Sequence, residues 1–303
     1  MSRKTTQSTT SPDSDNAVLC ICCGNTLLGT QVSCGICQAP VELSARINAR
    51  GEPARFVSIV GASGSGKTVY LGLLLDVLSH GTRTIKGLAN DSFSVAVQSQ
   101  TVTALQARCF PQKTSSDADS WNWVHCQVSD VRNRKKYLDL ITPDFAGEAI
   151  ALEMENPGAY PAISAVVTKS QAVVMLCDSI NVRDCGASED LFAMKLAAYI
   201  HTLRSKVNNP TRRGKIDLPL AIVFTKCDWC PDAADNPKSF AESNMSRLMQ
   251  YCKNSFSRFR MFAVGVAGSS ATIIDRSGRR AQVPIHTEPR GITEPIEWFL
   301  NLK

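Results

Sequence analysis

Residues 61–68 read "GASGSGKT" and fit the pattern G-x-x-x-x-G-K-[ST]. An apolar run, "FVSIV" at 56–60, precedes this stretch, and a helical pattern begins at Thr68. Glycines in such a loop let backbone N–H groups surround a β-phosphate, while Lys67 places its charge against phosphate oxygens and the Thr68 hydroxyl binds Mg²⁺. The sequence therefore predicts a phosphate-binding loop that accepts either ATP or GTP. Nucleotide contacts are expected from Gly61, Ala62, Ser63, Gly64, Ser65, Gly66, Lys67 and Thr68.

A second motif, "DFAGE" at 144–148, follows an expected strand. An acid at this place holds Mg²⁺ in phosphate-loop proteins, usually through water. A glycine three residues later lets its backbone N–H approach a γ-phosphate. The D-x-x-G pattern alone is weak, because many unrelated sequences contain it. We expect Asp144 to serve as a Mg²⁺ ligand and Gly147 as a nucleotide contact.

A third motif, "FTKCD" at 224–228, directly follows the apolar run "PLAIV". The Asp228 carboxylate can accept from both N1–H and the 2-amino group of guanine, and adenine lacks that pair of donors. Lys226 is expected to lie along the base, and Thr225 to tie this loop to the phosphate loop. A backbone N–H at Ala267, in "VGVAGSS", is placed to donate to guanine O6. These features favour GTP and GDP over adenine nucleotides.

The order of these motifs resembles the Ras-like, translation-factor-related (TRAFAC) class of P-loop GTPases, over about residues 55–303. The resemblance implies an α/β fold of three layers around a mostly parallel sheet, with GTP/GDP and Mg²⁺ as cofactors. An extra predicted helix, a cysteine-rich prefix and the wording "DFAGE" look most like the bacterial double-GTPase families. Such families are often linked to multi-gene conflict or defence systems. The resemblance thus implies a GTP-hydrolysing switch, with bacterial defence as its setting.

The stretch from Lys67 to Asp144 is longer than a small Ras-like protein needs. The surplus is an insertion at about 82–118, which contains a predicted helix at 91–109. It is expected to reshape the first switch region, which should supply a Thr whose hydroxyl binds Mg²⁺ and whose N–H senses the γ-phosphate. Thr114, in "FPQKTSS", is our candidate. Four other threonines compete with it: Thr82, Thr84, Thr101 and Thr103.

Glu148 stands where Ras-like enzymes have a Gln that orients water. Gln donates and accepts, whereas ionised Glu only accepts and adds negative charge near the γ-phosphate. Glu148 therefore either acts as a base on water, slows hydrolysis, or simply stabilises a helix N-terminus. With no arginine assignable to the transition state, we expect slow hydrolysis that a partner raises. The candidate catalytic residues are Lys67, Glu148 and Thr114.

Four cysteines near the N-terminus form two C-x2-C pairs separated by ten residues: Cys20, Cys23, Cys34 and Cys37. This spacing is typical of a structural Zn²⁺ site, with Cys22 as an alternative ligand. The segment 17–45 is too short to fold by apolar burial alone, so metal must stabilise it. Such zinc ribbons bind protein or nucleic acid, and without interleaved basic and aromatic residues we favour protein. A further pair, Cys227 and Cys230, overlaps the guanine motif and is interpreted as buried thiols.

The composition fits a globular protein of 303 residues with 44% hydrophobic residues and a net charge of +6. No apolar run reaches the ~18 residues of a membrane span, and the N-terminus has no apolar signal core. With twelve cysteines, a reduced cytoplasmic location is expected. We divide the chain into a disordered tail (1–16), the zinc ribbon (17–45), a linker (46–54) and the GTPase domain (55–303).

Periodicity predicts the secondary structure of the GTPase domain. Strands are expected at 56–60, 121–128, 137–144, 172–178, 219–224 and 260–266. The second and third of these should form an antiparallel hairpin. Helices are expected at 68–79, 91–109, 188–207 (capped by Ser188), 236–256 and 293–303, and a surface hairpin at 271–285.

Three alternatives to a GTPase switch stay open at this point. An ATP-using phosphate-loop enzyme is disfavoured by the "TKCD" motif. A scaffold that binds GTP with little hydrolysis is compatible with Glu148. A regulatory GTPase whose zinc ribbon binds nucleic acid is allowed but not favoured. In each case, the zinc ribbon and the insertion are the expected partner-binding segments.

Overall fold

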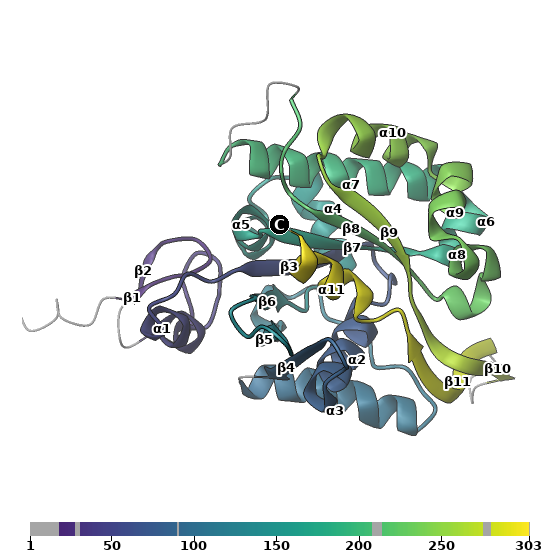
Figure 1. Ribbon diagram of the computed structural model, residues 1–303, viewed down its shortest axis with the longest axis horizontal. Coiled ribbons are helices and arrows are strands. Elements are labelled where there is room, and N and C mark those ends of the chain that lie inside the picture. The colour runs from purple at the N-terminus through teal and green to yellow at the C-terminus, as the bar shows by residue number, and fades with distance from the viewer. Residues whose placement is uncertain (1–17, 28–30, 90, 208–213, 275–279, 303) are drawn as a thin grey trace, which may run out of the picture.

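The computed structural model of the chain describes residues 18–27, 31–89, 91–207, 214–274 and 280–302. A seven-stranded sheet forms its centre (Figure 1). The strands lie in the order β4 (Ile85–Ala89), β5 (Trp123–Asp130), β6 (Tyr137–Pro143), β3 (Phe56–Gly61), β7 (Ala172–Asp178), β8 (Leu220–Thr225) and β9 (Phe259–Ala263). Pairs from β6 to β9 are parallel, while β5 is antiparallel to both neighbours. The predicted mostly parallel sheet and the hairpin are confirmed.

Both faces of the sheet are buried, which explains the continuous apolar runs of its central strands. Along β7, Val173 and Met175 join one hydrophobic cluster, whereas Val174 and Leu176 join another. Successive strand residues point to opposite faces, so the two clusters lie on the two sides of the sheet. Three layers result. One side carries α2 (Lys67–His80), α3 (Ser92–Gln106) and α11 (Glu294–Asn301), and the other α4 (Gly147–Glu155), α5 (Pro161–Lys169), α7 (Ala187–Ser205), α9 (Pro237–Asn244) and α10 (Ser246–Ser255).

The insertion contains the predicted helix α3, and also the edge strand β4. Asp91 caps α3 by accepting from Ser94 N at 2.7 Å, as the sequence suggested. The helix packs closely on α2, since a Cβ at Gly72 would lie 2.1 Å from Thr101 Oγ1. β4 was not predicted, because it has only five residues, buries only Ile85 and contains a glycine. The insertion is thus an integral part of the sheet.

Several helices differ from the sequence prediction. The single helix expected at 236–256 is two helices, α9 and α10, which Met245 separates because its backbone is not helical (φ −131°, ψ 53°). Ser188 does not cap α7, because Gly186 is the residue before the first turn and Ser188 Oγ donates instead to Cys185 O at 3.1 Å. The helices α4, α5, α6 (Ser179–Cys185) and α8 (Pro231–Asp235) were not predicted, nor were the short turns η1 (Ala118–Ser120) and η2 (Cys227–Trp229).

The C-terminal hairpin is longer than expected. β10 (Gly265–Ile274) pairs with β11 (Arg280–Arg290) in an antiparallel ribbon separate from the main sheet. The last strand of the main sheet accordingly ends at Ala263 rather than at Val266. The predicted turn of this hairpin, "RSGR" at 276–279, lies outside the described residues.

The cysteine-rich segment forms a small unit at the outer end of β3 (Figure 1). It contains β1 (Val18–Leu19), β2 (Thr26–Leu27) and α1 (Val41–Ala49). α1 crosses the expected boundary at 45/46, so the first part of the expected linker is helical and buries Ile47 against the cysteines. The predicted disordered tail, 1–16, lies outside the described residues. No helix in the described ranges has both the length and the apolar character to cross a membrane.

Candidate nucleotide-binding site

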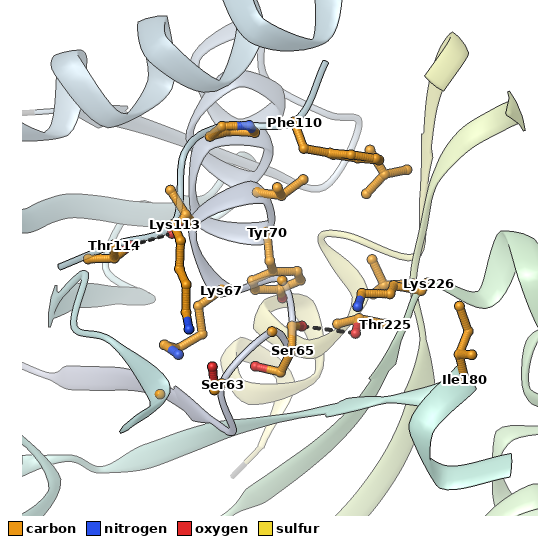
Figure 2. Close-up of a pocket in the computed structure, with 18 of the residues that line it drawn as sticks. Ser63, Ser65, Lys67, Tyr70, Phe110, Lys113, Thr114, Ile180, Thr225 and Lys226 are labelled. Atoms are coloured by element: carbon orange, nitrogen blue, oxygen red, sulfur yellow. Dashed lines mark hydrogen bonds between the residues drawn. The ribbon is translucent and has the colours of Figure 1, made fainter. Parts of the chain in front are cut away.

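The phosphate loop joins β3 to α2 at the carboxyl edge of the sheet. Gly64 (φ 72°) and Gly66 (φ 80°) adopt the left-handed conformation, and Gly66 is the residue that precedes α2. The loop therefore presents backbone N–H groups at a helix N-terminus, where an anion is stabilised. It borders a cavity of about 770 Å³ (Figure 2). The volume falls in the range of ordinary small-molecule sites.

Lys67 extends into the phosphate end of this cavity. Its side chain is buried, and its ammonium group lies 3.3 Å from the Gly61 carbonyl and 5.6 Å from the centre of the Phe145 ring. Burial lowers the pKa of Lys67 to about 8. A buried cation of this kind gains from an anionic ligand, because the ligand compensates the lost hydration. The residue thus fits the role that the motif predicts.

Three oxygen-bearing side chains meet beside the start of α2. Thr68 Oγ1 lies 3.0 and 3.1 Å from the Asp144 carboxylate oxygens and 2.9 Å from Thr114 Oγ1. Thr114 Oγ1 is 3.2 Å from Asp144 Oδ2. Burial raises the pKa of Asp144, so a bound cation would favour its charged form. An all-oxygen set from three separate segments is the donor chemistry that Mg²⁺ prefers.

The competing threonines lie elsewhere. Thr82 and Thr84 hydrogen-bond to each other at 3.1 Å at the start of the edge strand. Thr101 packs against Gly72 between α2 and α3, and Thr103 lies in the same helix. Thr114 is therefore the candidate that the structure brings to the Thr68 and Asp144 side chains.

Gly147 touches the backbone of the phosphate loop. A Cβ at this position would lie 2.0 Å from Ser63 N and 2.3 Å from the Ala62 carbonyl carbon. The next residue, Glu148, accepts from Ser63 Oγ at 2.8 Å and forms an ion pair with Lys113. The Lys113 ammonium and the Ser63 hydroxyl hold the pKa of Glu148 at about 2. The site therefore brings "DFAGE" and the phosphate loop together at the expected γ-phosphate end.

The other end of the cavity is formed by the "TKCD" loop. Thr225 Oγ1 donates to Ser65 O at 2.9 Å, which ties the two loops together as expected. Lys226 has a left-handed backbone (φ 57°) and pairs through its ammonium group with Asp178. One oxygen of Asp228 accepts from Val266 N at 3.0 Å. Since a carboxylate has several acceptor positions, Asp228 can hold this bond and still accept from a base.

Ala267 lines the same cavity, but its backbone belongs to β10 rather than to an irregular exit loop. Its Cα partner in the ribbon is Thr287, and the register shifts on either side of it. The ribbon places Ala267 near the Asp228 loop, since the neighbouring Gly265 lies against the Asp228 carboxylate. A Cβ at position 265 would approach Asp228 Oδ1 to 2.3 Å, so the Asp228 carboxylate would have to shift.

Sequence reasoning missed three charged residues at the site: Lys113 and Arg183, which line the cavity, and Asp178, which pairs with Lys226. Asp178 ends β7, caps α6 by accepting from Ile180 N at 2.9 Å, and orients Lys226. Because Asp178 is an acid at the end of a buried strand, the sequence contained a signal that could have indicated its role. Lys113 directly precedes Thr114, and no known motif marks it.

The four predicted metal-binding cysteines come together in the small N-terminal unit. Their Sγ atoms all lie within 4.8 Å of one another, with Cys20–Cys37 and Cys23–Cys34 both at 3.5 Å. A tetrahedral Zn²⁺ with bonds of about 2.3 Å separates its sulfurs by about 3.8 Å, so the cluster fits this ion. Cys22 is buried alongside. The Cys227 and Cys230 pair is buried in and next to the "TKCD" loop, which we call the base loop. Burial raises the pKa of Cys227 to about 11.

Comparisons with known proteins agree with this geometry. Residues 58–198 match the family model described as Double-GTPase 1, a stretch that includes Lys67, Asp144 and Glu148. No curated protein matches the sequence. The match and the sheet topology confirm the resemblance to the Ras-like double-GTPase families.

Similar solved structures include three GTP-binding proteins. The Arl6 BBS3 small GTPase from Trypanosoma brucei with bound GppNp has 13% identity and a TM-score of 0.37, over 70% of this chain and 87% of its own. The signal recognition particle receptor SRb-GTP/SRX complex from Chaetomium thermophilum has 13% identity and a TM-score of 0.41, over 72% and 93%. The Ski7 GTPase-like domain of S. cerevisiae bound to GTP has 13% identity and a TM-score of 0.44, over 82% and 49%.

Proposed function

We propose that this double-GTPase-like P-loop protein is a Mg²⁺-dependent switch that binds GTP and hydrolyses it to GDP. The observation that carries the proposal is a single cavity bordered by the phosphate loop, the Thr68–Asp144–Thr114 oxygen cluster and Asp228. Each of these groups suits a different part of one Mg²⁺–GTP molecule. Figure 2 shows Thr114 and Lys226 on opposite sides of the phosphate loop, so the cavity can hold an extended nucleotide.

The phosphates are held by the loop, in which Lys67 supplies charge and the backbone N–H groups supply donors. Thr68, Asp144 and Thr114 would hold Mg²⁺, which supplies charge neutralisation between the β- and γ-phosphates. Because Thr114 belongs to the insertion, its placement depends on the nucleotide state. Loss of the γ-phosphate would therefore release the segment around Thr114, as expected of a switch segment, whereas β4 stays in the main sheet.

Guanine specificity rests on Asp228. Its free acceptor positions match the N1–H and 2-amino donors of guanine, and adenine would leave the carboxylate without them. Lys226, oriented by Asp178, places its aliphatic stem along the base. The Thr225–Ser65 hydrogen bond keeps the base loop at a fixed distance from the phosphate loop.

Hydrolysis is expected to be slow. A water oxygen attacks the γ-phosphorus, the bond to the β–γ bridging oxygen breaks with its electrons left on GDP, and the water protons leave with inorganic phosphate and solvent. Glu148 can accept from this water, but it is a weak base for as long as Lys113 and Ser63 hold its pKa at about 2. A partner that repositions Glu148 or adds a cation would then raise the rate. Many turnovers per second by the isolated protein would contradict this proposal.

The N-terminal unit is proposed to be a zinc ribbon that contacts a protein partner together with the insertion. A role in nucleic-acid binding is the second candidate, and a GTP-binding scaffold with little hydrolysis is the third. A cytoplasmic location and a role in bacterial defence stay predictions from the sequence.

The proposal is tested by nucleotide binding with purified protein. The nucleotide retained on purification is identified, and the dissociation constants of GTP and ATP are measured with Mg²⁺ for wild type and for Asp228→Asn. We expect wild type to prefer GTP and Asp228→Asn to lose that preference while ATP binding stays weak. A wild-type preference for ATP, or an unchanged preference in the variant, would refute guanine recognition by Asp228.

A further inference from the structure

A second lysine enters the phosphate end of the cavity. Lys113 lies in the insertion and lines the cavity together with Lys67. Figure 2 shows both side chains extending toward Ser63, Lys113 from the insertion and Lys67 from the start of α2. The phosphate-loop motif accounts for Lys67 alone. The second cation has no counterpart among the predicted site residues.

Lys113 and the phosphate loop share one acceptor. Glu148 Oε1 accepts from Ser63 Oγ at 2.8 Å and also from the Lys113 ammonium group. One oxygen of Glu148 thus accepts hydrogen bonds from the phosphate loop and from the insertion, at the expected γ-phosphate end. A γ-phosphate oxygen is an acceptor of the same kind and belongs to a group of higher charge, so it competes for both donors.

The position of Lys113 is fixed by its neighbour. Thr114 lies within 3.2 Å of both Thr68 Oγ1 and Asp144 Oδ2, at the expected Mg²⁺ position. The γ-phosphate of a P-loop nucleotide contacts this ion. Lys113 is therefore next in sequence to a proposed Mg²⁺ ligand, and its flexible four-carbon stem gives the ammonium group room to change partner.

We propose that Lys113 is a γ-phosphate-binding residue that distinguishes GTP from GDP. With GDP, or with no nucleotide, its ammonium group stays on Glu148. With GTP, it moves to a γ-phosphate oxygen and releases Glu148 to accept from water. This inference rests on the proposed GTP binding and adds a specific ligand and a specificity-determining residue to it.

The expected contribution of Lys113 to GTP affinity depends on how exposed its side chain is. A charge-assisted hydrogen bond changes affinity by about 10- to 100-fold. The Lys113 side chain is 68% exposed in its present position, so solvent screens part of its charge. We therefore expect about a tenfold contribution to GTP affinity and almost none to GDP affinity.

The test measures dissociation constants for a non-hydrolysable GTP analogue and for GDP, both with Mg²⁺. Lys113→Met is compared with Lys135→Met, which removes an equal charge from an exposed turn outside the cavity. The first variant should weaken the analogue about tenfold and GDP less than twofold, and the second should change neither. Equal weakening of both nucleotides, or no weakening, would overturn the proposal. Thermal unfolding of each variant checks that it is folded.

A double-mutant comparison separates direct from indirect action. If Lys113 binds the γ-phosphate itself, Lys113→Met also weakens the analogue in a Glu148→Gln background. If Lys113 acts only by holding Glu148, the effect disappears in that background, which would contradict the proposal. Failure of wild type to prefer GTP over ATP would refute the proposed function and this inference with it. If wild type binds GTP tightly and Lys113→Met binds the GTP analogue as tightly as wild type does, only the inference is refuted.

Discussion

The side-chain amide of Gln38 donates a hydrogen bond to the Asp119 carboxylate at 2.6 Å. Gln38 directly follows the cysteine pair Cys34–Cys37, whereas Asp119 lies five positions after Thr114. In the same segment as Asp119, Trp121 Nε1 donates a hydrogen bond to Ser115 O, next to Thr114, at 2.9 Å. The cysteine unit is thus connected to the segment that carries Thr114 into the nucleotide site.

We predict that this hydrogen bond couples the N-terminal unit to nucleotide binding. Gln38→Ala and Asp119→Ala should each weaken binding of a GTP analogue, by about threefold, because the bond is exposed and its contribution is below about 1 kcal/mol. The double variant should be no weaker than either single one. Dissociation constants of the four proteins provide the measurement, and fully additive effects would show that the two residues do not interact.

Metal removal should unfold the N-terminal unit. The unit is too small to fold by burial alone, and its four Sγ atoms converge to within 4.8 Å. Cys34→Ser should therefore lose one equivalent of bound zinc and the protection of residues 31–49 from hydrogen exchange. Metal content and exchange by mass spectrometry provide the readouts. The matched control is Cys109→Ser, an exposed cysteine outside the cluster, which should retain both metal and protection.

The part of the site that could be predicted is the part that short motifs encode. Gly61–Thr68, Asp144 and Asp228 were indicated because spacing within a few residues fixes their chemistry. Lys113 was missed because its partner, Glu148, lies 35 positions away and the pair follows from folding of the insertion. The Lys226–Asp178 pair, 48 positions apart, has the same cause.

The elements of the fold likewise divide into those that local sequence signals predict and those that they do not. The apolar runs of the buried parallel strands and the cap at Asp91 are strong local signals, and these elements were predicted. The edge strand β4 is short and half exposed, so its pattern is weak. The break at Met245 lies within a continuous helical pattern. The Met245 side chain is fully buried, and helix propensity along the sequence does not indicate a break that depends on tertiary packing.

Gly147→Ala should separate GTP binding from GDP binding. The added Cβ would lie 2.0 Å from Ser63 N, so the start of α4 must move away from the phosphate loop. We expect the GTP analogue to bind at least tenfold more weakly, with a smaller change for GDP, which lacks the phosphate at that end. Gly35→Ala is the control, because a Cβ there meets nothing within 4 Å. Unchanged GTP binding by Gly147→Ala would show that this contact is dispensable.

Asp139 should make stability depend on pH. It is buried in β6, where Arg50 donates to both of its oxygens at 2.8 and 3.0 Å and Arg55 N donates at 3.0 Å. Burial raises its pKa, but the neighbouring His125 and Arg50 side chains and the Arg55 N–H lower it more. The net pKa therefore lies below the ordinary value of 3.8.

Because the folded-state pKa is lowered, the ionised carboxylate stabilises the fold above pH 3.8, and this contribution is lost as the pH falls toward the folded-state value. Asp139→Asn should cost about 3 kcal/mol of unfolding free energy at neutral pH, since it leaves Arg50 without its charged partner. The difference from wild type should shrink in acid. Denaturant unfolding across pH measures this difference. The control is Asp184→Asn, from the exposed Arg183–Asp184 pair, which should leave stability nearly unchanged. A pH-independent difference would mean that Asp139 acts through packing rather than through its charge.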